Sequence, residues 1–78
     1  MQGGELMTTV REYRLKLKWP VSRLAKAAGL APQTVSRIED GEPAFDYTVA
    51  AIAEALSEAL RERITIDDLE GVKIVGRD

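Results

Sequence analysis

The side chains best suited to specific polar binding lie on one short helix, which the sequence predicts over Ala31 to Asp40. Only Val35 and Ile38 of this segment point convincingly toward a core. Its outer face therefore carries an amide, a hydroxyl and a guanidinium group, which belong to Gln33, Thr34 and Arg37. These groups donate and accept hydrogen bonds, so the helix offers a surface for a polar partner rather than a reaction centre.

Residues that would support catalysis or metal binding are scarce. The chain has no histidine and no cysteine, so the usual general base, nitrogen ligand and thiolate are all missing. It has no glycine-rich loop of the kind that cradles phosphates. The paired acids Asp67 and Asp68 follow Thr65 at the spacing of a helix cap, which explains them better than catalysis does. We expect no enzyme activity, no metal and no cofactor.

Charge is strongly segregated along the chain, although the net charge is only −2. Seven basic residues and one acid occupy positions 11–37, whereas ten acids and two arginines occupy positions 39–70. The first segment therefore carries a charge of +6 and the second a charge of −8. The basic segment permits contact with phosphates, and by itself it is equally consistent with a solvated surface.

Length and composition indicate one small domain. A chain of 78 residues buries only about 60% of the surface that its unfolded form exposes, so a partner subunit would add stability. No apolar run approaches the roughly 18 residues of a membrane span, and the N-terminus lacks the pattern of a signal peptide. These features favour a cytoplasmic protein without a membrane partner.

Two helices precede the polar one. Thr9 and Glu12 have capping-box spacing, which predicts a first helix from about Val10 to Lys18. Trp19-Pro20 breaks this helix and begins the next, which is predicted from about Val21 to Ala28. Gly29 then suits the left-handed end of that helix, and about three residues separate it from the polar helix.

The second half predicts one long helix and a short tail. Asp46 is a good N-cap for a fourth helix of about 17 residues, and apolar residues follow it at helical spacing: Val49, Ile52, Ala53, Leu56, Leu60 and Ile64. Thr65 and Asp68 predict a last short turn near Ile66 to Leu69. The only plausible strand is Val72 to Val75, so the tail is either disordered or paired with another segment.

Several of these residues occur together at a distinctive spacing: Leu24-Ala25, Gly29, Val35, Ser36, Ile38, Glu39 and Gly41. In this combination the chain resembles the helix-turn-helix family of lambda-type phage repressors and Cro, also called XRE-like. The likeness continues into the flanking helices at Val10, Tyr13-Arg14, Thr48, Ile52, Ala53 and Leu56. It implies an all-α domain of four to five helices over residues 9–70. A flexible arm over residues 1–8 would precede this domain, and a tail over residues 71–78 would follow it.

The resemblance assigns roles to individual side chains. It implies a sequence-specific regulator of transcription, most simply a repressor, whose helix at positions 31–40 enters the major groove of double-stranded DNA. Base contacts would then fall to Gln33, Thr34 and Arg37, and contacts to phosphate would fall to Ser22, Arg23, Lys18 and Lys26. A structural ion pair would join Arg14 to Glu39.

Some positions depart from the family pattern. Val21 stands where the family often has a glutamine that contacts phosphate, and Pro32 stands where a side chain often reaches a base. The loop at positions 41–46 contains acids where the family is often basic. These departures predict modest affinity for each subunit, which a homodimer would offset. The apolar residues expected at the dimer interface are Leu60, Ile64, Ile66, Val72 and Ile74, the last two in a tail that would supply a dimer strand.

One alternative function remains open from the sequence. The acidic, apolar second half also suits an antitoxin-like or regulatory module that binds a protein partner, with DNA binding as a secondary property. The basic first half and the polar face of the third helix favour DNA.

Overall fold

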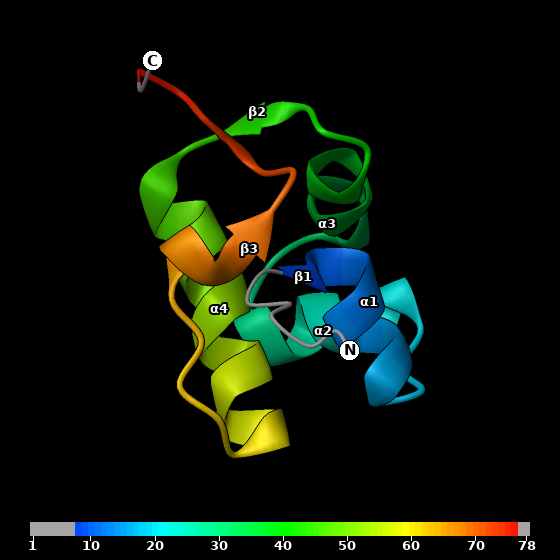
Figure 1. Cartoon of the computed structure of the whole chain (residues 1–78). Coiled ribbons are helices and arrows are strands. Elements are labelled where there is room, and N and C mark those ends of the chain that lie inside the picture. The colour runs from blue at the N-terminus through cyan, green and yellow to red at the C-terminus, as the bar shows by residue number, and fades with distance from the viewer. Residues whose placement is uncertain (1–7, 77–78) are drawn as a thin grey trace.

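The computed structural model describes residues 8–76 as four helices around one apolar core, with two short strand pairs. Figure 1 shows how the helices are arranged. The helices are α1 (Val10–Lys16), α2 (Val21–Ala28), α3 (Pro32–Glu39) and α4 (Asp46–Leu60), followed by a single 3-10 turn, η1 (Ile66–Asp68). The strands are β1 (Thr8–Thr9), β2 (Pro43–Ala44), β3 (Leu69–Glu70) and β4 (Lys73–Ile74). The predicted all-α class with a short C-terminal strand is confirmed. The expected arm over residues 1–8 lies outside the described residues apart from Thr8, and so do residues 77–78 of the tail.

Helix α1 begins as predicted and ends earlier than predicted. The Glu12 amide donates to Thr9 Oγ1 and the Thr9 amide donates to Glu12 Oε1, both at 3.0 Å, which completes the capping box. The helix ends at Lys16 because Lys18 takes the left-handed conformation, with φ of 58°. The Trp19 amide then donates to the Arg14 carbonyl at 3.2 Å. The predicted end at Lys18 is therefore wrong, since Leu17 is the C-cap and the left-handed Lys18 turns the chain before Pro20, which itself restricts only Trp19.

The bounds of α2 and the turn after it match the prediction. Gly29 has φ of 74°, and the Leu30 amide donates to the Ala25 carbonyl at 2.8 Å across the end of α2. A residue without Cβ adopts this conformation at little cost, so Gly29 allows the sharp change of direction. Ala31 is then the N-cap of α3 and Pro32 its first residue. Helix α2 packs against both α3 and α4.

Two expectations about α4 are wrong. Phe45 is the N-cap, and Asp46 is the first helical residue, where its charge still favours the positive end of the helix. The helix has 15 residues and ends at Leu60, because Arg61 takes the left-handed conformation with φ of 57°. Ile64 is therefore beyond the helix, although it is buried. Ile64 falls at the helical spacing of the apolar residues in α4, but its side chain is buried because the chain folds back onto that helix.

One serine fixes the segment that folds back onto α4 after Leu60. Ser57 Oγ lies 2.7 Å from the Ala53 carbonyl, 3.0 Å from the Ile64 carbonyl and 3.0 Å from the Ile64 amide, which donates to it. The predicted cap of the following turn is also present, since the Thr65 amide donates to Asp68 Oδ2 at 2.9 Å. These bonds fix Ile64 against α4.

The tail pairs within the chain rather than ending free. Strand β4 runs parallel to β2, and the Val75 amide donates to the Ala44 carbonyl at 2.8 Å. Strands β1 and β3 form a second parallel pair that the sequence did not predict. The expectation of a single plausible strand is therefore wrong. Both pairs tie distant segments to the helical core, whose fully buried residues include Leu24, Val35, Ile52 and Leu56.

Candidate nucleic-acid interface

The outer face of α3 is free to meet a partner. Val35 and Ile38 are buried and anchor the helix, whereas Gln33 and Arg37 are exposed one turn apart and Thr34 is half-buried between them. Within residues 8–76, no hydrogen bond or ion pair engages the side chain of Gln33 or Arg37. The two side chains with the richest donor and acceptor groups thus share one exposed face.

An ion pair fixes the end of α3 against α1. Arg14 Nε lies 2.7 Å from Glu39 Oε2 and Arg14 Nη2 lies 3.0 Å from Glu39 Oε1, so the contact is bidentate. Arg14 Nη1 also donates to the Trp19 carbonyl at 2.9 Å, which ties the turn after α1 to the same guanidinium. The side chains are only 10% and 7% exposed. The hydrogen bond to Glu39 raises the pKa of Arg14, so the pair is permanently charged on the arginine side.

The helix pair α2 and α3 therefore has the arrangement of a helix-turn-helix: α2 packs into the core through Leu24 and Ala25, a turn at Gly29 follows, and α3 keeps an exposed outer face. A protein-family model described as Helix-turn-helix matches residues 10–66. The chain belongs to this DNA-binding helix-turn-helix family. The match confirms the resemblance to lambda-type repressors and Cro and identifies a regulator of transcription. Neither a search of curated proteins nor a search of solved structures finds a significant match.

The first two amides of α2, those of Val21 and Ser22, precede the bond from the Arg23 amide to the Pro20 carbonyl at 3.0 Å. The N-cap of α2 is Pro20, which makes no side-chain hydrogen bond to the first turn. The amides that open a helix carry partial positive charge and bind anions when no side chain caps them. Ser22 and Arg23 lie in this first turn and are exposed, so the residues predicted to contact phosphate stand beside suitable backbone groups.

The other basic residues predicted to contact phosphate are also exposed. The Arg23 guanidinium lies over the Trp19 ring at 5.0 Å, which holds its long side chain near the surface of the turn. Lys26 is one turn further along α2, and Lys18 occupies the left-handed position between α1 and α2. All of these cations lie on α2 or in the turn before it.

Sequence reasoning missed an exposed aromatic pair next to α3. The Phe45 and Tyr47 rings stack with centroids 5.3 Å apart and an interplanar angle of 6°. Their side chains are 53% and 69% exposed, although aromatic rings are usually buried. The signal in the sequence was the concentration of two of the chain's four aromatic residues within three positions, at the end of the acidic loop.

The residues predicted for a dimer interface lie mostly inside the monomer. Ile64 is buried, and the remaining four are half-buried where they pack against the core: Leu60, Ile66, Val72 and Ile74. Much of their apolar surface therefore lies in contacts within one chain.

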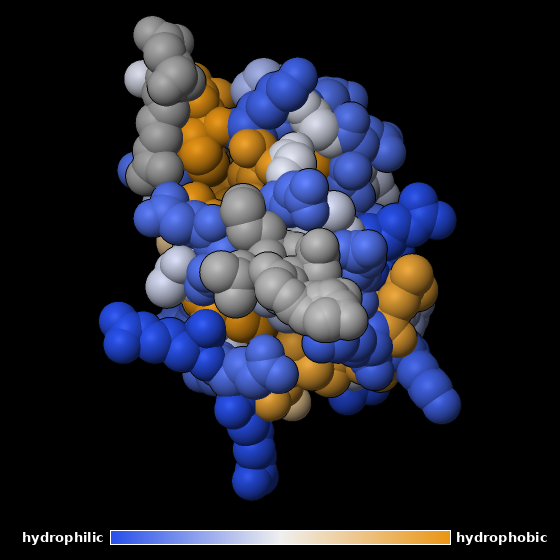
Figure 2. All heavy atoms as spheres, in the orientation of Figure 1, coloured by the Kyte–Doolittle hydropathy of each residue, from blue (hydrophilic) through white to orange (hydrophobic). Residues whose placement is uncertain are grey.

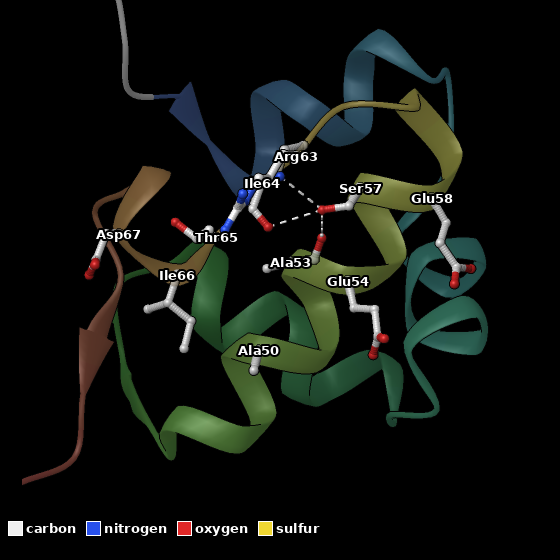
Figure 3. A pocket seen from close by; sticks show the side chains of 10 residues that line it. All are labelled: Ala50, Ala53, Glu54, Ser57, Glu58, Arg63, Ile64, Thr65, Ile66 and Asp67. Carbon is white, nitrogen blue, oxygen red and sulfur yellow. Dashed lines mark hydrogen bonds between the residues drawn. The ribbon is translucent and has the colours of Figure 1, made fainter.

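A groove runs between α4 and the returning segment of residues 63–67 (Figure 3). It has a volume of about 660 Å³, and its floor is formed by small residues of α4, among them Ala50 and Ala53. Glu54 and Glu58 rise from the same helix at its rim (Figure 3). The hydroxyl of Ser57 lies in this groove and makes hydrogen bonds to three backbone groups, so its role there is structural.

Proposed function

We propose that this regulator is a sequence-specific transcriptional repressor that reads the major groove with α3 and binds its operator as a homodimer. The observation that carries the proposal is the exposed face of α3. Gln33 and Arg37 stand there without partners in the described chain, on a helix whose end is fixed by the Arg14–Glu39 pair. A rigid helix with free donors and acceptors is what base recognition requires.

The side chains on this face suggest the bases that they read. A glutamine amide pairs with adenine through N6 and N7, and an arginine guanidinium pairs with guanine through O6 and N7. Gln33 and Arg37 are therefore assigned to adenine and guanine in neighbouring positions of each half-site. Thr34, half-buried beside them, is assigned to a phosphate or to a thymine methyl group.

Contacts to the DNA backbone would fall to the start of α2 and the turn before it. Ser22, Arg23 and the opening amides of α2 are the principal phosphate contacts in this proposal, with Lys18 and Lys26 at its edge. The acidic loop after α3 adds nothing to this attraction, because Glu42 is exposed there and repels phosphate. A second subunit would compensate by doubling the contacts on adjacent half-sites about 34 Å apart.

Selection of duplexes from a random pool tests the DNA-binding proposal, followed by fluorescence anisotropy titrations on the selected sequence. Arg37→Ala removes a bidentate contact worth about 1–3 kcal/mol, so we expect its affinity to fall roughly 5- to 150-fold with relaxed preference at one base pair. Arg63→Ala is the matched control, because it removes the same charge from an exposed residue beyond α4. Equal losses for the two variants, or a pool that yields no preferred sequence, would count against base readout by α3.

The repressor role needs a separate measurement. A reporter whose promoter overlaps the selected operator should lose expression when the wild-type protein is produced, and should keep it when Gln33→Ala/Arg37→Ala is produced. Increased expression with the wild type would instead identify an activator.

A second candidate function is favoured by the groove beside α4. Its lining carries three acids, Glu54, Glu58 and Asp67, and one cation, Arg63. This balance suits a basic segment of a protein partner, as an antitoxin-like or regulatory module would bind. DNA binding would then be secondary. A gel shift at two salt concentrations separates the two functions. Specific binding with a steep salt dependence supports the repressor, whereas its absence together with a stoichiometric co-purifying protein supports the module.

A further inference from the structure

The exposed apolar side chains are unevenly distributed over the molecule. Among residues 8–76, four large hydrophobic residues are strongly exposed, and three of them belong to one area: Phe45 at 53%, Tyr47 at 69% and Val75 at 49%. Phe45 and Tyr47 are at the start of α4, and Val75 is held beside β2 by the bond from its amide to the Ala44 carbonyl. We call these three residues the aromatic patch. Figure 2 shows apolar atoms gathered near the C-terminal end of the described chain, at the level of β2 in Figure 1.

The fold itself does not require an aromatic residue at this position. Phe45 is the N-cap of α4 and its side chain makes no capping hydrogen bond, although serine, threonine, aspartate or asparagine there would stabilise the helix. The Phe45 ring instead stacks in parallel on Tyr47 in contact with solvent. Such a cluster is comparable with the largest apolar patch that a typical monomer exposes, and patches of that size are often functional sites.

We infer that the aromatic patch is the contact through which a second copy of this chain docks by two-fold symmetry. The charges around the patch favour this occupant. Lys73 is paired in register with Pro43, while the acids Glu42 and Asp46 precede and follow β2. Because both signs flank the patch, a copy rotated by two-fold symmetry can set cations against acids. A phosphate backbone would meet the same acids as repulsion.

The position of the patch links this contact to DNA reading, and here the inference rests on the proposed function. A groove of about 290 Å³ is lined by Thr34 and Arg37 of α3 together with Phe45 and Val75. A two-fold axis through the patch therefore places the two α3 helices on either side of the subunit contact. This is the arrangement that a palindromic operator needs.

The size of the patch sets the strength of the dimer. From the exposed fractions, its side chains offer on the order of 300 Å² per copy, against about 800 Å² per partner in a stable interface. We therefore expect a weak dimer in free solution, which two adjacent half-sites strengthen by holding the subunits together. The sequence-predicted dimer residues offer less, because they already pack inside the monomer.

Sedimentation of a designed variant tests the inference. Phe45→Ser/Tyr47→Gln removes both rings, and the new serine supplies an N-cap for α4, so the variant should remain folded. The control is Leu15→Gln, which removes an exposed apolar residue of 54% exposure from α1. The average mass of the wild type and of the control should rise from one toward two subunits as concentration increases. The double variant should stay at one subunit mass throughout.

Binding to selected duplexes with one or two half-sites gives a second readout. The double variant should bind one half-site like the wild type and lose at least tenfold in affinity for two half-sites. Association of the double variant like that of the wild type would overturn the inference. So would a wild type that remains one subunit both free and on two half-sites, or a variant whose only loss is on a single half-site, which would place DNA on the patch. Failure of all DNA binding would refute the proposed function and leave the sedimentation result to judge the patch.

Discussion

Arg14→Ala should cost this protein much of its stability. The substitution removes two bonds to Glu39, at 2.7 and 3.0 Å, and one to the Trp19 carbonyl at 2.9 Å. It also leaves the Glu39 carboxylate, 7% exposed, without its countercharge. Breaking a buried pair from one side costs about 3–5 kcal/mol. A domain of this length has a total stability of about 4–12 kcal/mol, so the melting temperature should fall by roughly 12–40 °C.

Urea denaturation followed by circular dichroism measures this loss at 25 °C, with the melting temperature as a second readout. The informative comparison is the double variant Arg14→Met/Glu39→Leu, which replaces both charges with apolar side chains of similar length. It should recover most of the stability, because no buried charge is left unpaired. Arg11→Ala, on the exposed side of α1, is the control and should change stability by less than about 0.5 kcal/mol. An unchanged melting temperature for Arg14→Ala would refute the structural role of the pair.

The same pair makes a prediction about pH. The hydrogen bond from Arg14 to the Glu39 carboxylate raises the pKa of Arg14 above that of a free arginine. The stability that the ion pair contributes is therefore fully present below the unfolded pKa of Arg14. It is lost only as the pH rises through the still higher folded pKa. Both values lie above the range in which proteins are studied. Titration of Arg14 should therefore add no pH dependence to stability between about pH 6 and pH 10.

Three further predictions concern single side chains. Arg61→Gly should stabilise the protein by about 0.5–1 kcal/mol in urea denaturation, because Arg61 has φ of 57°, and no gain would mean that its side chain compensates for the strain. Ser57→Ala should destabilise it by about 1–3 kcal/mol by leaving the buried Ile64 backbone groups unbonded, whereas Ser36→Ala on the exposed face of α3 should be neutral in the same assay. Lys26→Ala should reduce the slope of log affinity against log salt by about 0.9 on every duplex, and an unchanged slope would remove Lys26 from the phosphate contacts.

The helix-turn-helix itself was predictable because its signals are local. Thr9 with Glu12 predicts the start of α1 from a capping box that the structure contains, and Gly29 and Pro32 predict the turn and the start of α3 from backbone preferences alone. The Arg14–Glu39 pair spans 25 positions and came only from the family resemblance. Neither residue has a local feature that predicts the other as its partner.

The second half of the chain was harder to predict because non-local contacts decide it. Ile64 fits the helical spacing of α4, yet the helix stops at Leu60 and Ser57 holds Ile64 from outside the helix. The strands of two residues each carry no pattern of their own, and only their pairing across the fold defines them. The stacking of Phe45 on Tyr47 depends likewise on where α4 begins, which the sequence placed one residue too late.

The distribution of charge bears on how such a repressor would discriminate among sites. Attraction to phosphate is independent of sequence and supplies essentially all non-specific binding. Here the cations are concentrated before α3, while Glu42 and the acids of the second half oppose the approach of other DNA surfaces. The proposed repressor would therefore bind random DNA weakly, and base contacts from Gln33 and Arg37 would make up a large share of its affinity. Because a regulator must outcompete a genome of non-specific sites, the ratio of the two affinities matters more than either value. The proposed dimer contact would raise that ratio further, since it would add affinity only at correctly spaced half-sites.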